Sequence, residues 1–333
     1  MNPPLKIAIA GIGNVARNNY LPFLRTQKDV DLGYWNRTSA AAQEAAQQFG
    51  GNPFATLEDL VAWKPDSVLV LTHETGRYEV SLALLQAGAR RLFFEKPLVA
   101  ALGQAHVSEK DFEDGKALLG LARKKGCETA MIFNYRFFAQ TIAAKTIAAE
   151  RNFGAVMHVS AQVHYACWSH CLDLLHYFAG EIEEVTALAS QTVRKGQGFD
   201  APDVLASFRL INGGGGTLIG TAGMAWQYPL YEMTFTFEKG RIHMRDIDGT
   251  LEILDGKTSY HEMRSFVRDG SRWNAYSASF ERSLSSYLDS LRSGGKPPIP
   301  GEDGLRELQT EAAIRRSIAE RRPVRIAQEF PLL

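Results

Sequence analysis

Short apolar runs alternate with helical patterns along the first third of the chain. The apolar runs have the length and composition of strands, and they cover Leu5–Ala10, Asp31–Asn36, Ser67–Thr72, Arg91–Glu95 and Glu128–Phe133. Segments with helical periodicity separate these runs. Because strands that alternate with helices form a parallel sheet with helices on both faces, the pattern predicts a doubly wound α/β domain.

Two of the helical segments carry recognisable ends. Thr56 is followed three residues later by Asp59, and Ser108 by Asp111, which is the spacing of an N-terminal cap. Gly126 stands where the second of these helices should end, because glycine adopts the left-handed conformation that closes many helices. These ends support the alternation of strands and helices.

The pattern changes after about Arg136. Between Gly154 and Arg268 the segments are mostly strand-like, and one helix is predicted among them near Trp168–Phe178. Asn212–Gly216 lies between two of these strands and predicts a hairpin turn. This part of the chain therefore predicts a large, mostly antiparallel sheet.

Two helical segments, Trp273–Arg292 and Glu302–Glu320, follow the second group of strands. A chain of 333 residues is also long for one hydrophobic core. We therefore predict two domains, an α/β domain over residues 1–133 and an α+β domain over residues 134–333. The helices are too few to cover both faces of the second sheet, so we expect it to be open on one face and to form the interface of a homodimer or homotetramer.

Composition narrows the class of protein. The chain has 37 Lys and Arg and 37 Asp and Glu, a formal net charge of +0, and proteins that grip nucleic acid usually carry a basic excess, so we expect no nucleic-acid partner. No apolar stretch reaches the ~18 residues of a membrane helix and the first residues do not resemble a signal peptide, so we expect no membrane partner. Only 3 cysteines occur, which favours a reducing, cytoplasmic location.

A glycine-rich turn directly follows the first predicted strand and opens a helix. Its residues are Gly11, Ile12, Gly13, Asn14, Val15 and Ala16, which fit the pattern G-x-G-x-x-A of dinucleotide-binding sites. The first glycine permits a tight turn, the second lets the backbone approach a pyrophosphate, and the alanine lets helix and strand pack closely. The N-terminus of the helix then favours the negative charge. In this context the turn predicts a Rossmann-type dinucleotide site.

The end of the second strand bears on the choice of cofactor. An NAD site usually has Asp or Glu there, roughly 20 residues after the glycines, to bind the ribose 2′-hydroxyl. This chain has Asn36, Arg37, Thr38 and Ser39 instead. A guanidinium and two hydroxyls suit a 2′-phosphate, so NADP(H) is favoured and NAD(H) stays possible. The alternative is a surface arginine beside an ordinary helix cap.

Several motifs in order resemble those of one protein family. They are Tyr20–Leu24 after the glycine-rich turn, Glu95–Pro97 after the fourth strand, Asn134–Phe137, His170–Glu181 and Pro300–Leu305. Together they resemble the glucose–fructose oxidoreductase, inositol dehydrogenase and rhizopine-catabolism (Gfo/Idh/MocA) family along nearly the whole chain. The resemblance implies an oxidoreductase that acts on a sugar, a polyol or a related carbonyl or imine.

The resemblance also implies roles for residues at the ends of the third and fourth strands. The lysine of Glu-Lys-Pro, Lys96 here, is expected to be catalytic and to lie beside the nicotinamide. Glu95, Thr72 and His73 are expected to border the cofactor. An ammonium group at this place can stabilise a developing alkoxide or relay a proton. The Lys96–Pro97 peptide is often cis in relatives, and we expect the same here.

The second-domain motif departs from the family pattern, which has an Asp four residues before a catalytic His. The resemblance identifies His170 as the catalytic histidine, and the position four before it is Ala166. A rival alignment on Asp173 and His176 has a spacing of three and breaks the match at Tyr177. The missing carboxylate leaves open a second hypothesis, a non-catalytic NADP(H)-sensing binding protein of the same fold.

Aromatic and charged residues near the domain junction are candidates for the substrate pocket, although they could equally belong to the core. They are Tyr135, Arg136, Tyr165, Trp168 and Asp173.

The second-domain motif also contains residue types that bind zinc. Its candidate ligands are His164, Cys167, His170 and Cys171. This segment crosses a strand–helix junction, and a filled nicotinamide pocket would claim His170. We therefore predict no metal.

Overall fold

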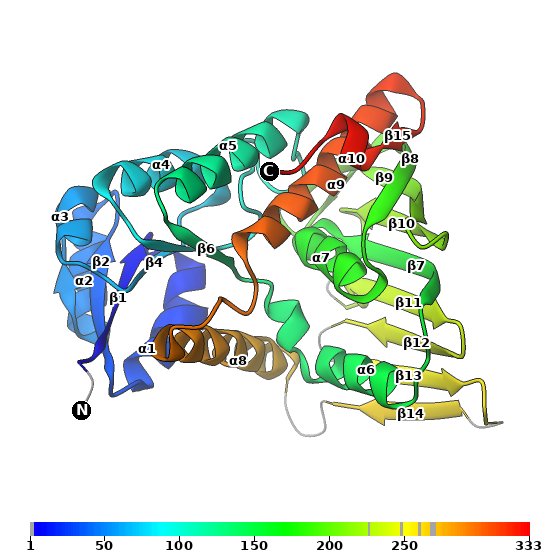
Figure 1. The fold of residues 1–333 in the computed structure, drawn as a ribbon, viewed down its shortest axis with the longest axis horizontal. Coiled ribbons are helices and arrows are strands. Elements are labelled where there is room, and N and C mark those ends of the chain that lie inside the picture. Colours follow the sequence, from blue (N-terminus) through cyan, green and yellow to red (C-terminus); the bar gives the residue numbers. More distant parts are fainter. Residues whose placement is uncertain (1–2, 226, 247–248, 259–260, 267–270) are drawn as a thin grey trace.

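Two sheets form the framework of the molecule. The computed structural model describes residues 3–225, 227–246, 249–258, 261–266 and 271–333. The N-terminal sheet and the C-terminal sheet lie side by side in Figure 1, joined by segments that run between them. The predicted fold class, a doubly wound α/β domain followed by an α+β domain, is confirmed.

The N-terminal sheet has six parallel strands in the order β3-β2-β1-β4-β5-β6. This is the strand order of a dinucleotide-binding doubly wound sheet, in which ligands bind beyond the carboxyl ends of the central strands. The strands are β1 (Leu5–Ala10), β2 (Val30–Trp35), β3 (Asn52–Pro53), β4 (Ser67–Val70), β5 (Arg91–Phe94) and β6 (Glu128–Met131).

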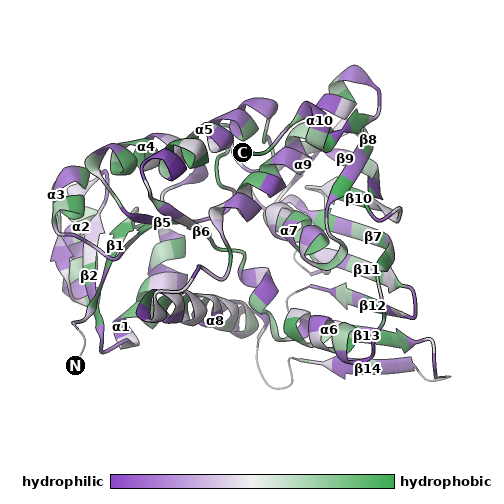
Figure 2. Cartoon of the chain, viewed as in Figure 1, coloured by the Kyte–Doolittle hydropathy of each residue, from purple (hydrophilic) through white to green (hydrophobic). Residues whose placement is uncertain are grey.

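Helices cover this sheet, and their sequences explain their ends. They are η1 (Ala16–Tyr20), α1 (Leu21–Thr26), α2 (Ser39–Phe49), α3 (Leu57–Ala62), η2 (Glu74–Gly76), α4 (Arg77–Ala87) and α5 (Glu109–Lys124). The Thr56 hydroxyl accepts a hydrogen bond from the Asp59 amide at 3.0 Å, and Ser108 and Asp111 form a capping box, as predicted. Figure 2 shows hydrophobic and hydrophilic residues together on α4 and α5, as expected of helices with one face on a core.

The C-terminal sheet has nine strands in the order β14-β13-β12-β11-β7-β10-β9-β8-β15. Only β7 and β10 pair in parallel, so the sheet is mostly antiparallel, as predicted. Asn212 forms the predicted hairpin turn, where its side-chain oxygen accepts from the Gly214 amide at 2.9 Å. The strands are β7 (Val156–His164), β8 (Ile182–Gly196), β9 (Phe199–Leu210), β10 (Gly215–Thr221), β11 (Tyr231–Phe237), β12 (Gly240–Arg245), β13 (Thr250–Asp255), β14 (His261–Ser265) and β15 (Val324–Arg325).

Helices of the C-terminal half pack on this sheet and on the N-terminal domain. They are η3 (Asn134–Phe137), α6 (Ala139–Glu150), η4 (Tyr165–Cys167), α7 (Trp168–Ala179), α8 (Arg272–Ser293), α9 (Gly301–Glu320) and α10 (Ile326–Glu329). Helix α8 returns to the N-terminal core: the Tyr287 hydroxyl lies 2.7 Å from that of Ser67, and Phe280 packs edge-on against Tyr20. The last third of the chain therefore fixes the two domains against each other.

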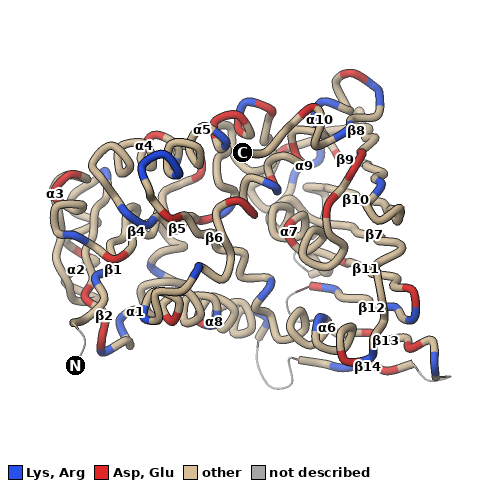
Figure 3. The backbone as a smooth tube through the Cα atoms, viewed as in Figure 1, with Lys and Arg blue, Asp and Glu red and all other residues tan. Residues whose placement is uncertain are grey.

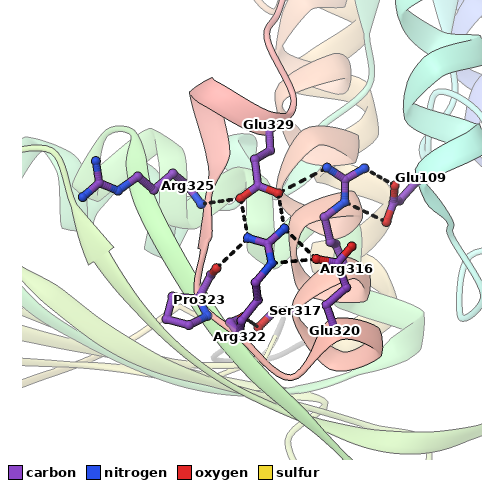
Figure 4. A network of polar contacts seen from close by, with 8 residues as sticks. All are labelled: Glu109, Arg316, Ser317, Glu320, Arg322, Pro323, Arg325 and Glu329. Atoms are coloured by element: carbon purple, nitrogen blue, oxygen red, sulfur yellow. Dashed lines mark hydrogen bonds and ion pairs between the residues drawn. The ribbon is translucent and has the colours of Figure 1, made fainter.

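Charges of both signs are spread over both domains, as Figure 3 shows. A network near the end of the chain, drawn in Figure 4, ties three helices together. Glu329 of α10 accepts from Arg316 and Arg322, and Arg316 also pairs with Glu109 of α5. No helix in the described parts of the chain is long and apolar enough to cross a membrane.

Candidate active site

The glycine-rich turn after β1 has the shape that its sequence predicts. Gly11 has a φ of +104°, and a Cβ there would lie 2.5 Å from the Thr72 backbone nitrogen, so only glycine fits. A Cβ at Gly13 would meet nothing within 4 Å, so its backbone borders open space. Ala16 is fully buried against the sheet. The turn can therefore hold a bulky group against its backbone.

A helix begins directly after this turn. The Arg17 amide donates to the Gly13 carbonyl at 3.0 Å, while the first amides of a helix have no acceptor within the helix. Asn14 and Val15 are exposed at this helix start. Free amides and the helix dipole favour an anion such as a pyrophosphate.

A cavity of about 500 Å³ adjoins the turn. Its walls come from the turn and from the ends of β2 and β4. Eight of the predicted cofactor residues line it: Gly11, Ile12, Gly13, Asn36, Arg37, Thr38, Thr72 and His73. The lining residues are Gly11, Ile12, Gly13, Trp35, Asn36, Arg37, Thr38, Leu71, Thr72, His73, Thr75, Gly76 and Val80.

Asn36 and Arg37 differ sharply in their contacts. The Asn36 side-chain oxygen accepts from the Ile12 amide at 2.9 Å, and its nitrogen donates to the Thr38 carbonyl at 3.2 Å. Asn36 thus stabilises the glycine-rich turn by hydrogen bonding to its backbone. Arg37 is exposed and, among the residues described, has no ion-pair or hydrogen-bond partner for its guanidinium. Ser39 is exposed at the first position of α2 and is not among the cavity-lining residues.

Arg77, to which the sequence assigned no role, joins this cavity to the Glu-Lys-Pro motif. Its guanidinium is buried and donates to the Thr72 carbonyl at 2.9 Å and to the Pro97 carbonyl. Residues at the ends of β4 and β5 are thereby held together. His73, in contrast, is exposed and accepts from the Thr75 amide at 3.5 Å.

Glu95 and Lys96 follow β5, and the Lys96–Pro97 peptide is cis, as predicted. Glu95 is buried, accepts from the Tyr20 hydroxyl at 2.9 Å, and accepts from the Lys96 amide at 2.9 Å. Burial raises the pKa of Glu95, although the charges of Lys96 and Arg77 oppose that shift. The Glu95 carboxyl group thus fixes the backbone at Lys96 through this hydrogen bond.

The Lys96 ammonium points toward the second domain. It donates to the Gln104 side-chain oxygen at 2.8 Å and reaches the Ala166 carbonyl at 3.5 Å. Gln104 is a neighbour that sequence reasoning missed, since it lies in a loop without a motif. Because Ala166 precedes α7, Lys96 is brought to the N-terminal end of the helix that carries His170.

His170 is 2% exposed, and aromatic rings fix its orientation. Its imidazole stacks on Tyr135, with centroids 4.0 Å apart and planes at 9°, and meets Phe133 edge-on. Burial, together with the charge of Lys96, holds the pKa of His170 well below its usual value, so the imidazole is neutral. Its Nδ1 atom is buried and has no hydrogen-bond partner in the described structure.

Four of the five predicted substrate residues are engaged within the protein. Arg136 pairs with Asp173 through Nε at 2.8 Å, and burial outweighs this partner to raise the pKa of Asp173 to about 6. The Tyr165 hydroxyl donates to the Pro202 carbonyl at 2.6 Å, and Trp168 is fully buried.

Tyr135, the fifth of these residues, forms a wall of the site through its stack on His170. Its hydroxyl lies 3.1 Å from the Cys167 sulfur. Over the described ranges, no group of three or more His, Cys, Asp or Glu side chains is arranged to hold a metal ion.

Two family models match this chain. The model of the Gfo/Idh/MocA oxidoreductase family with an NAD-binding Rossmann fold matches residues 5–133. The model of the C-terminal alpha/beta domain of the same oxidoreductase family matches residues 158–326.

The chain is also similar to individual dehydrogenases in sequence and to a solved structure in fold. The chain is 31% identical to D-glucoside 3-dehydrogenase of Escherichia coli (strain K12) over 144 residues, which span 41% of this chain and 37% of that protein. It is 24% identical to myo-inositol 2-dehydrogenase of Thermotoga maritima over 277 residues, 79% of this chain and 80% of that one. In fold it resembles a super-repressor mutant of Gal80p from Saccharomyces cerevisiae, with a TM-score of 0.82 at 13% identity, over 99% of this chain and 100% of that one.

Proposed function

Since the chain belongs to the Gfo/Idh/MocA family of NAD-binding oxidoreductases, we propose that it is an NADP(H)-dependent enzyme that transfers a hydride to or from a sugar, a polyol or a related carbonyl or imine. The observation that carries this proposal is the approach of the Lys96 ammonium to the Ala166 carbonyl, just before the helix that holds the buried, neutral imidazole of His170. The sugar and polyol dehydrogenases among the relatives support the substrate class.

The residues of the cavity fit a dinucleotide. The backbone of Gly13 and the helix start after it would hold the pyrophosphate, since a Cβ at Gly13 would meet nothing within 4 Å and the backbone there borders open space. When bound, the nicotinamide supplies the hydride donor or acceptor. Lys96 and His170 remain to handle the substrate oxygen and its proton.

Arg37 supports the preference for NADP(H). Its guanidinium lines the cavity without a carboxylate partner in the described structure, so it is available for a 2′-phosphate. Asn36 stands where a carboxylate would repel that phosphate, and its own hydrogen bonds hold the turn. NAD(H) stays a possible second cofactor.

The chemistry assigned to this pair of residues follows from their surroundings. In the oxidation direction the substrate hydroxyl must lose its proton, and a neutral imidazole accepts it. The Lys96 ammonium then stabilises the charge that develops on the oxygen. In the reduction direction His170 returns the proton to that oxygen.

The second candidate function is a protein that binds NADP(H) without turnover. Ala166 favours it, because this position lacks the carboxylate expected beside the catalytic histidine. One experiment separates the two candidates: sugars and polyols are screened with NADP⁺ and NAD⁺ while the absorbance of the reduced nicotinamide is followed. Turnover that Lys96→Met abolishes supports the enzyme, whereas tight NADPH binding with no turnover on any substrate supports the binding protein.

We also propose that the chain forms a homodimer or homotetramer through the C-terminal sheet. Leu188 lies opposite Leu205, and Leu205 lies opposite Ile219, so three exposed apolar side chains form one row across β8, β9 and β10. Such a row is best buried against a second copy of the same surface. The three free cysteines fit a reducing, cytoplasmic location.

A further inference from the structure

Two carboxyl groups are buried one helical turn apart on α9, at Glu307 and Glu311. Both residues are 0% exposed. Helix α9 packs against α7 and α5, and residues four apart share one face of a helix. Buried carboxyl groups are costly, and the chemistry proposed above uses neither of them.

The polar atoms around this pair are also buried and unsatisfied. All four carboxyl oxygens lack a hydrogen-bond partner among the described residues, as do the Ser169 hydroxyl, the Trp168 indole nitrogen and Nδ1 of His170. Residues 168–170 form the first turn of α7, which packs against α9, and the imidazole of His170 lies against Tyr135 and Phe133. Buried polar groups of this kind are normally satisfied by an ordered water or by a proton.

Glu307 faces groups from three elements. Burial and the nearby carboxylates of Glu311 and Asp173 raise its pKa, whereas the Ser169 hydroxyl and the Lys96 ammonium lower it. Ser169 faces the carboxyl group without reaching full hydrogen-bond geometry. Glu307 is therefore within the electrostatic reach of Lys96 and of the residue that precedes His170.

Glu311 lies one helical turn after Glu307 on α9 and faces other charged groups. Burial raises its pKa and Asp111 of α5 adds to that shift, whereas Arg315, 3.6 Å away, and the Trp168 indole lower it. Burial raises the pKa of the nearby Tyr165 hydroxyl, the charge of Arg315 lowers it, and the charge of Glu311 raises it. Two buried carboxyl groups this close cannot both ionise readily, so the pair favours the state with one shared proton.

We propose that Glu307 and Glu311 hold one proton between them and exchange it with the Lys96–His170 site, in place of the carboxylate that position 166 lacks. The inference rests on the proposed function, because it assigns the pair to the proton of that reaction. During oxidation the substrate hydroxyl proton passes to His170, and the ionised member of the pair then accepts it, which leaves both carboxyls protonated. During reduction one of these protons returns through His170 to the substrate oxygen. Glu307 and Glu311 touch no substrate, so they are positioning residues.

The first test needs no substrate. Infrared spectra of the apo protein are compared between the wild type, Glu307→Gln, Glu311→Gln and, as a matched control, Glu302→Gln, whose exposed carboxylate lies on the same helix. We expect a protonated carboxyl band at neutral pH that shifts or loses intensity in Glu307→Gln and in Glu311→Gln and is unchanged in Glu302→Gln. An unchanged band in both buried variants overturns the shared proton.

The second test is kinetic and uses a rescue. Glu307→Gln should lower kcat at least about tenfold, flatten its pH profile, and leave KM and NADPH affinity nearly unchanged. Adding Ala166→Asp to Glu307→Gln should restore much of the lost kcat, because it returns a carboxylate to the site. A normal kcat and pH profile in Glu307→Gln, or no rescue by the second change, overturns the exchange.

The two tests separate this inference from the proposed function. If no substrate is turned over, the proposed function fails, and the proton exchange, which rests on it, falls with it. The infrared result then still decides whether the pair holds a proton. If turnover is found and the infrared band is unaffected, the proposed function stands and this inference is wrong. If Glu307→Gln does not fold, the infrared spectrum and the pH profile of kcat are measured on Glu311→Gln instead, because the proton is shared between the two residues.

Discussion

The imidazole of His170 lies flat on the ring of Tyr135, with centroids 4.0 Å apart and planes at 9°. The family resemblance predicts a carboxylate four residues before this histidine, and the residue at that position is Ala166, which cannot orient the ring through a side-chain hydrogen bond. Stacking on Tyr135 orients the imidazole instead, and burial together with the charge of Lys96 lowers its pKa.

Replacing Tyr135 tests this arrangement. Tyr135→Leu removes the stacking partner, so we expect kcat to fall about tenfold or more, as for a misplaced catalytic base. Tyr135→Phe keeps the ring and loses only the contact of the hydroxyl with Cys167, so it should retain most of the activity. Equal losses in both variants would assign the effect to the hydroxyl and contradict the stacking role.

Arg37 should decide the cofactor preference. A charge-assisted hydrogen bond is worth about 1.5–3 kcal/mol, so loss of its contact with a 2′-phosphate should weaken NADPH binding roughly 10- to 100-fold. Fluorescence titration of Arg37→Ala with both reduced cofactors measures this, and NADH binding should change little. Arg90→Ala, another exposed arginine of the same domain, is the control. Equal or tighter NADH binding by the wild type would refute the preference.

The row of exposed apolar residues on the open sheet predicts self-association. Light scattering of the wild type should give a mass at least twice the 36.9 kDa of one chain. Leu188→Glu and Leu205→Glu should shift the protein toward that single-chain mass, because they place charge in the apolar row. Leu102→Glu, at an exposed loop position of the N-terminal domain, should not. A wild-type monomer at micromolar concentration rules out the interface.

The network in Figure 4 predicts that part of the free energy of unfolding is lost at acidic pH. Arg322, and to a lesser degree Arg316, hold the pKa of Glu329 at about 2. Because this pKa lies below its unfolded value, the stabilisation is present above about pH 4.5 and is lost as the pH falls toward 2.

Glu329→Gln should therefore lower the free energy of unfolding by about 0.5–1 kcal/mol at neutral pH, the range of a partly exposed ion pair, and by almost nothing near pH 2. Denaturant unfolding across this pH range measures the difference. Glu150→Gln, which removes an exposed carboxylate on α6, serves as the control. A loss for Glu329→Gln that does not vary with pH would show that the network acts through packing and not through charge.

Local patterns were enough to predict most of the fold. Strand β1, the glycine-rich turn and the capping box at Ser108 each depend on neighbours within a few residues, and all three were predicted correctly. Helix α6 and strands β13 and β14 were not predicted. Strand β14 is short and mostly exposed, so it lacks the apolar alternation that marks a half-buried strand.

The candidate site was predictable only where a motif marks it. Lys96 stands in such a motif, but its partner Gln104 lies in a loop without one. No motif marks Arg77 as a structural link. Its role is to bind the carbonyls of Thr72 and Pro97, which only the folded chain brings together after β4 and β5. In the sequence Glu307 is indistinguishable from an ordinary surface residue of a helix, and only the packing of α9 on α7 and α5 makes it a buried acid.

In the proposed reaction, Lys96 and His170 handle the charge and the proton that accompany hydride transfer. Once a substrate is identified, kcat and the NADPH dissociation constant are measured for Lys96→Met and His170→Ala. Each variant should lower kcat at least ~10²-fold and leave NADPH affinity little changed. Because burial lowers the pKa of His170, wild-type oxidation should also persist below the usual histidine pKa of ~6.5. Near-normal kcat in both variants would contradict the assignment of the active site.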